Sequence, residues 1–127
     1  MKFPKFIWAI SLIFLSQIAC TPDSSTNTDQ LTGRWEIFEA TRNGRPTESL
    51  AKLFFEFSAE GKMRTNITGA STEATYQLSK NQILQRESEI EIDYVVEQMS
   101  DSVLILSTEL RGYSFRFVLN KLSGEEE

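Results

Sequence analysis

Apolar and polar side chains alternate along most of residues 31–122, which is the pattern of β-strands with one buried face. In residues 89–99, for example, Ile90, Ile92 and Tyr94 alternate with acidic neighbours. The same pattern predicts eight strands, at residues 33–40, 52–57, 62–67, 72–78, 82–86, 89–99, 102–110 and 113–122. The chain is therefore expected to be an all-β protein.

Short turn sequences separate these strands, and Asn43-Gly44 is the strongest turn signal among them. Eight antiparallel strands joined by tight turns predict an up-and-down sheet, which removes its exposed edges by closing into a barrel. A sandwich of two sheets is the alternative. A barrel requires its first and last strands to pair, so a contact between the strand of Trp35 and the strand of Phe115 distinguishes the two folds.

The N-terminal residues have the pattern of a secretion signal. Lys2 and Lys5 precede a nearly continuous apolar run over residues 6–15, and Ala19 stands directly before Cys20. The apolar run is shorter than the roughly 20 residues that a membrane-spanning helix needs. The pattern therefore favours a cleaved signal over residues 1–19, with an uncleaved anchor as the alternative.

Residues 17–20 (Gln-Ile-Ala-Cys) resemble the lipobox of bacterial lipoproteins, in which the cysteine is lipidated and becomes the new N-terminus. The resemblance implies that Cys20 carries fatty acyl chains such as palmitate, and that these hold the protein to a membrane of the cell envelope. Thr21 after the cysteine is compatible with sorting to the outer membrane. An ordinary cleaved signal without lipidation is the other interpretation.

Polar composition marks the segments on either side of the predicted barrel. The stretch after Cys20 is rich in Ser, Thr, Asp and Asn and cannot bury enough apolar surface to order itself. The predicted organisation is a signal peptide at residues 1–19, the lipidated cysteine with a flexible tether at 20–30, the barrel at 31–122 and an acidic tail at 123–127.

Composition limits the kinds of function that the chain can have. Loss of Lys2 and Lys5 with the signal changes the net charge from −5 to −7, which argues against nucleic acid as a partner. The sequence has no histidine and no cysteine besides Cys20, which excludes Ser-His-Asp and Cys-His catalysis and zinc sites built on those residues. We expect no enzymatic activity, no cofactor and no metal ion.

The motif Gly33-Arg34-Trp35 opens the first strand, and Asn43-Gly44-Arg45-Pro46 follows it in the first loop. Together with the hairpin sequence at residues 55–62, these features resemble the lipocalin-like domain of small bacterial lipoproteins. The resemblance implies an eight-stranded up-and-down barrel, with a basic residue, Arg116 or Lys121, over the tryptophan. We expect Trp35 to close one end of the barrel and Gly33 to allow close approach of the chain there.

Aromatic side chains are the best candidates for a ligand site. The six expected to line the barrel interior are Phe55, Phe57, Tyr76, Tyr94, Phe115 and Phe117. A buried phenol needs a hydrogen-bonding partner, so the two tyrosines would be the polar contacts of a ligand. The alternative is that these rings simply fill a small barrel.

The predicted function is therefore that of a lipid-anchored envelope lipoprotein whose non-catalytic barrel binds a small apolar or amphipathic molecule. The alternative is a filled barrel that serves as a protein-interaction or structural module of the envelope.

Four acidic residues, Glu89, Glu91, Asp93 and Glu97, lie along one predicted strand. Carboxylates in such a row could bind a hard cation. A solvated outer face opposite Lys and Arg of the adjacent strands is the favoured interpretation.

Overall fold

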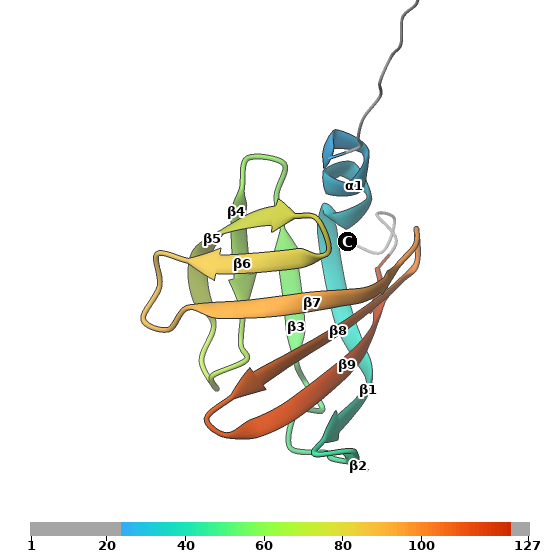
Figure 1. Ribbon diagram of the computed structural model, residues 1–127, viewed down its shortest axis with the longest axis vertical. Helices are drawn as coiled ribbons and strands as arrows, with labels where there is room; N and C mark the ends of the chain where they lie inside the picture. The colour runs from blue at the N-terminus through green and yellow to red at the C-terminus, as the bar shows by residue number, and fades with distance from the viewer. Residues whose placement is uncertain (1–23, 123–127) are drawn as a thin grey trace, which may run out of the picture.

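The computed structural model of the protein describes residues 24–122, which form a short helix and one antiparallel sheet (Figure 1). Helix α1 is Ser24–Leu31. The strands are β1 (Gly33–Arg42), β2 (Arg45–Pro46), β3 (Phe54–Phe57), β4 (Lys62–Thr65), β5 (Thr72–Ser79), β6 (Gln82–Arg86), β7 (Ile92–Met99), β8 (Val103–Leu110) and β9 (Tyr113–Lys121). No helix in this part of the chain is long and apolar enough to cross a membrane.

The sheet closes into a barrel because β1 pairs with β3 along one edge and with β9 along the other. The pairing with β9 extends from Trp35 opposite Lys121 to Arg42 opposite Phe115. This pairing confirms the predicted barrel and rules out the sandwich. Strand β2 pairs with the last two residues of β1, so the barrel wall has eight strands and β2 extends the first hairpin.

All eight predicted strands are present, with one notable difference at a boundary. The strand predicted from residue 89 begins at Ile92. The preceding residues form a turn instead, in which Glu87 has a φ of 60° and the Ser88 hydroxyl donates to the Ile90 carbonyl oxygen at 2.7 Å. Local side-chain bonding of this kind competes with strand pairing.

The two ends of the barrel differ. One end, the base, carries α1 and the turns at residues 58–61, 80–81 and 100–102. The opposite end, the mouth, carries the turns at residues 43–44, 66–71, 87–91 and 111–112. Figure 1 shows α1 and β2 at opposite ends of the molecule.

Residues 24–30, which were expected to belong to a flexible tether, are helical and form α1 together with Leu31. The C-terminal end of α1 packs on the base. Leu31 is fully buried, and its carbonyl oxygen accepts a hydrogen bond of 2.8 Å from the indole nitrogen of Trp35. Lys121 Nζ donates to the carbonyl oxygen of Gln30 at 2.8 Å. These contacts exist only against the folded barrel, so tertiary packing outweighs the polar composition of the segment.

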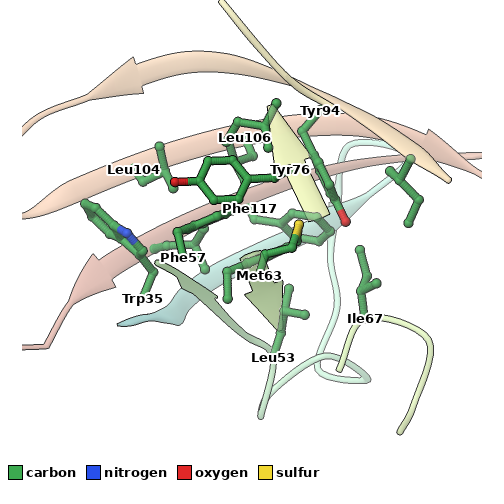
Figure 2. Packing of buried hydrophobic residues seen from close by; sticks show 14 of the residues in the cluster. Trp35, Leu53, Phe57, Met63, Ile67, Tyr76, Tyr94, Leu104, Leu106 and Phe117 are labelled. Carbon is green, nitrogen blue, oxygen red and sulfur yellow. The ribbon is translucent and has the colours of Figure 1, made fainter. Parts of the chain in front are cut away.

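Side chains from every wall strand meet inside the barrel (Figure 2). The fully or almost fully buried apolar residues are Leu31, Trp35, Ala40, Leu53, Phe55, Phe57, Met63, Ile67, Ala74, Tyr76, Ile83, Ile92, Tyr94, Leu104, Leu106, Phe117 and Leu119. They form one continuous cluster.

The acidic row of the strand predicted at residues 89–99 lies opposite basic residues on the outside of the barrel. Arg86 contacts Asp93 at 2.8 Å and Glu91 at 3.9 Å, and Arg116 contacts Glu97 at 2.9 Å. The prediction of a solvated, charge-paired face is confirmed for these three carboxylates.

Candidate functional site

The base of the barrel is closed by Trp35, which is fully buried. The ammonium group of Lys121 lies 5.0 Å from the centre of a Trp35 ring, whereas Arg116 pairs with Glu97 instead. Gly33 has a φ of +132°, and a Cβ at this position would lie 2.9 Å from Cε of Lys121. The positive φ therefore favours glycine at this position, where the lysine side chain also passes close to the backbone. Lys121 is the basic residue over the tryptophan.

Five of the six predicted ligand-binding aromatics are buried and contact one another. The ring centres of Phe55 and Tyr94 are 5.4 Å apart at nearly perpendicular planes, and those of Phe57 and Tyr76 are 5.0 Å apart. Phe55 also contacts Phe117, at 6.2 Å between ring centres. Edge-to-face and tilted contacts of this kind stabilise a packed core.

The hydroxyl groups of the two buried tyrosines have partners within the protein. Tyr94 donates to Oε1 of Gln85 at 2.7 Å, and Tyr76 donates to the backbone carbonyl oxygen of Ser58 at 2.7 Å. Figure 2 shows the two phenols pointing in opposite directions. Burial raises the pKa of both hydroxyls, so both tyrosines are neutral hydrogen-bond donors at physiological pH.

A layer of buried polar side chains, which the sequence did not predict, lies on the mouth side of this core. Gln85, Thr65 and Thr108 point inward with at most 8% of their surface exposed. The two threonine hydroxyls each donate to a backbone carbonyl oxygen of the neighbouring strand at 2.8 Å. The signal in the sequence is the alternation itself, because each of the three stands two residues after a buried apolar residue, namely Met63, Ile83 and Leu106.

Aromatic rings continue from the core to the rim along β9. Phe117 is fully buried, Phe115 is half-buried and stacks on it at 5.8 Å, and Tyr113 is 44% exposed with its ring centre 6.3 Å from that of Phe115. The three residues are spaced two apart, so they share the inner face of the strand. Phe115 is thus the one predicted aromatic that the structure places at the mouth, next to Tyr113.

Other apolar side chains lie around the same end of the barrel. Leu50, Ile90 and Leu110 are partly buried against the core, and Leu110 is directly opposite Tyr113. Together with Tyr113 and Phe115 they form what we call the mouth surface.

Two arginines adjoin the mouth surface. Arg42 is opposite Phe115 in the sheet and therefore shares its inner face, and its guanidinium group lies 5.1 Å from the centre of the Tyr113 ring. Arg45 is opposite Arg42 across the two-residue turn. They border a hollow of about 540 Å³, here called the rim hollow, which is lined by Arg42, Asn43, Arg45, Pro46, Thr47 and Tyr113.

Cys20, the predicted lipidation site, lies outside the described residues, as do the predicted signal peptide and acidic tail. Within residues 24–122, no group of three or more His, Cys, Asp or Glu side chains is placed to hold a metal ion. The chemistry that the mouth offers is stacking, apolar contact and attraction of negative charge.

The fold has a counterpart among solved structures. A lipocalin-like protein from Bacteroides uniformis superposes with a TM-score of 0.56 over 73% of this chain and 99% of its own, at 17% sequence identity. No protein-family model matches the chain, and no curated protein matches it. The similarity concerns the fold, and the chain accordingly folds as a closed, eight-stranded, lipocalin-like β-barrel.

Proposed function

We propose that the protein is a lipid-anchored lipoprotein of the bacterial envelope whose barrel binds a small amphipathic molecule at its mouth, without catalysis. The observation that carries this proposal is the unbroken run of rings from buried Phe117 through half-buried Phe115 to exposed Tyr113. An apolar group bound there would contact the mouth surface and be continuous with the core below it. Apolar walls with a few polar groups are typical of small-molecule sites.

The mouth surface, and not the deep interior, is the proposed site. The hydroxyl groups of Tyr94 and Tyr76 already donate hydrogen bonds to Gln85 and Ser58, and their rings contact neighbouring rings. The layer of Gln85, Thr65 and Thr108 lies between that core and the mouth. A ligand that contacts the mouth surface leaves these contacts in place.

The spacing between Cys20 and α1 constrains the orientation of a lipid-anchored barrel. Four residue steps separate Cys20 from Ser24, and an extended chain covers at most about 14 Å over that distance. Because α1 packs at the base, lipidation of Cys20 would hold the base toward the membrane. The mouth would then face away from the anchoring leaflet and take its ligand from the aqueous side.

A filled barrel acting as a protein-interaction or structural module is the second candidate. The mutual contacts of the buried rings, and the internal partners of both buried tyrosines, favour it. Under this alternative the mouth surface would be covered by another envelope protein.

Native mass spectrometry of the intact protein purified from membranes, with solvent extraction of co-purifying molecules, separates the two candidates. Tyr113→Ala should reduce the amount of bound small molecule, whereas Phe38→Ala should not. Phe38 is the matched control because it is an aromatic residue, 68% exposed, at the bulge of β1 outside the mouth surface. A wild-type protein free of any small molecule, but recovered with a stoichiometric protein partner, would favour the filled barrel.

The anchor is tested separately with Cys20→Ser. We expect the wild-type protein to float with membranes and to carry the added mass of acyl chains, and the variant to do neither. Flotation and mass that are unchanged by the substitution would contradict lipidation.

A further inference from the structure

Two positive charges stand directly opposite each other at the rim. Arg42 and Arg45 are register partners across the turn of Asn43 and Gly44, so their side chains leave the hairpin on the same face. Like charges in directly opposed positions destabilise a strand pair. The arrangement therefore has a cost unless something else compensates the two charges.

No carboxylate among the described residues compensates them. The ion pairs of residues 24–122 engage Arg34, Arg64, Arg86 and Arg116, and none involves Arg42 or Arg45. The protein as a whole is acidic, with 18 Asp and Glu residues against 13 Lys and Arg. Arg42 and Arg45 thus stand directly opposite each other without an ion-pair partner among the described residues, on a protein that is acidic as a whole.

The hairpin that carries the arginines is fixed in place. The Asn43 backbone nitrogen donates to the Ser114 carbonyl oxygen at 2.6 Å, and the Ser114 nitrogen donates to Oδ1 of Asn43 at 2.9 Å. Thr47 donates from its backbone nitrogen to the carbonyl oxygen of Ala40 at 3.0 Å. A rim held in this way loses little conformational freedom when it binds a ligand.

We infer that the rim hollow binds the anionic head of an amphipathic ligand, with Arg42 and Arg45 as its cationic partners and Tyr113 beside it. Guanidinium groups pair with carboxylate and phosphate oxygens through two parallel hydrogen bonds, which suits a head of either kind. The inference rests on the proposed function, since it names the chemical class of the molecule bound at the mouth.

Head and tail would occupy adjoining parts of one surface. Arg42 is opposite Phe115 in the sheet, and its guanidinium group lies over Tyr113. An anion between the two arginines therefore has the apolar mouth surface directly beside it. A ligand with charge at one end and a hydrocarbon chain behind it fits this arrangement better than a free inorganic ion.

Photolabelling of the full-length protein in phosphatidylcholine vesicles tests the inference. The probe is dodecanoic acid that carries a diazirine and an alkyne tag, and the matched uncharged probe is the corresponding dodecanol. We expect saturable labelling by the acid at peptides containing residues 50 or 113–115. Arg42→Gln and Arg45→Gln should each raise the half-saturating concentration of the acid about tenfold or more.

Arg111→Gln is the matched control, because Arg111 lies in the adjacent β8–β9 turn and is not among the residues that line the rim hollow. It should change the half-saturating concentration by less than about twofold, as expected for a screened charge outside the site. Thermal unfolding of each variant checks folding, and loss of Arg42 or Arg45 should not lower the melting temperature.

The remaining outcomes separate this inference from the proposal on which it rests. Equal labelling by acid and alcohol, insensitive to Arg42 and Arg45, would overturn the anionic site and leave amphiphile binding standing. Displacement of the probe by inorganic phosphate as effectively as by dodecanoate would show a site for free anions and overturn the amphipathic part. Absence of saturable labelling at the mouth by either probe would contradict the proposed function itself.

Discussion

At the scale of single residues, the Tyr94 hydroxyl shows how polar groups are accommodated in this barrel. It is fully buried and donates to Gln85, which is itself 1% exposed. The carboxamide nitrogen of Gln85 is 3.4 Å from the Ser88 hydroxyl, at the edge of the turn before β7. Two successive hydrogen bonds, which meet at the Gln85 side chain, thus connect the aromatic core to the turn at the mouth.

Tyr94→Phe should lower the free energy of unfolding by about 1–3 kcal/mol, because it leaves Oε1 of Gln85 buried without its donor. Chemical denaturation measures the change. Tyr113→Phe, which removes a hydroxyl from a ring that is 44% exposed, is the control and should have little effect. Equal stability of Tyr94→Phe and the wild type would show that the buried pair contributes nothing.

Gly33→Ala should destabilise the base. The substitution places a methyl group 2.9 Å from Cε of Lys121, at a φ of +132° that residues with a side chain rarely adopt. Gly69→Ala also has a positive φ, of +109°, but meets no atom within 4 Å. We expect a larger loss of melting temperature for Gly33→Ala than for Gly69→Ala, and equal losses would show that the close approach of Lys121 adds nothing to the cost of the positive φ.

At the scale of elements, ion pairs on the outside of the barrel connect three neighbouring strands. Glu56 of β3 accepts hydrogen bonds from Arg34 of β1 at 2.9 Å and from Arg64 of β4 at 2.8 Å, and the three residues are directly opposite one another. Burial opposes ionisation of Glu56, but the two arginines hold the pKa of its carboxyl group below the ordinary value.

This lowered pKa predicts the direction of an acid effect. The folded state binds the Glu56 proton less readily than the unfolded state, so the stabilisation is complete above the ordinary glutamate pKa of about 4.3 and is lost as the pH falls below it. Glu56→Gln should therefore reduce the fall in stability between about pH 5 and pH 3, measured by urea unfolding at each pH. Arg64→Gln should act in the same direction, and a pH dependence unchanged in both variants would contradict the account.

The helix α1 shows where sequence reasoning fails at this scale. Its polar residues predict a tether, but the favourable contacts of Leu31 and Gln30 come from outside the helix. Trp35 belongs to β1, and Lys121 is 91 residues away in the sequence. Leu31→Ala should lower the free energy of unfolding by about 3–5 kcal/mol, the usual cost of a cavity at a fully buried leucine. Denaturant titration checks this, and a change below about 1 kcal/mol would mean that α1 adds little to the closure of the base.

At the scale of the whole molecule, the closed barrel could be predicted because each strand has its own alternating pattern. The pairing of Trp35's strand with Phe115's strand completes it. The candidate site is harder to predict from the sequence, because it depends on which residues of neighbouring strands are opposite each other. Arg42 and Arg45 face inward at the rim only because Arg42 is opposite Phe115, and no local pattern contains that information. The alternating pattern predicts which aromatic side chains are buried, but it contains no information about which rings contact one another.

The barrel's two ends have different roles in the proposal, the base near the membrane and the mouth toward the ligand. The core between them, including Ile83, Leu104 and Leu106, is fully buried and should not change when a ligand binds. The outer face between β8 and β9, where Ile105 is opposite Val118, should not change either. Binding at the mouth should therefore change the surroundings of the mouth residues and leave those of the deep core and the outer face unchanged.

The most direct test of the central claim is a titration of the intact, methyl-labelled protein in nanodiscs with dodecanoate, followed by methyl NMR. The account predicts saturable shifts at the methyl groups of Leu50, Ile90 and Leu110, with those of Ile83 and Leu104 unmoved. Shifts confined to the deep core or to Ile105 and Val118, or no saturable shift at the mouth, would contradict it.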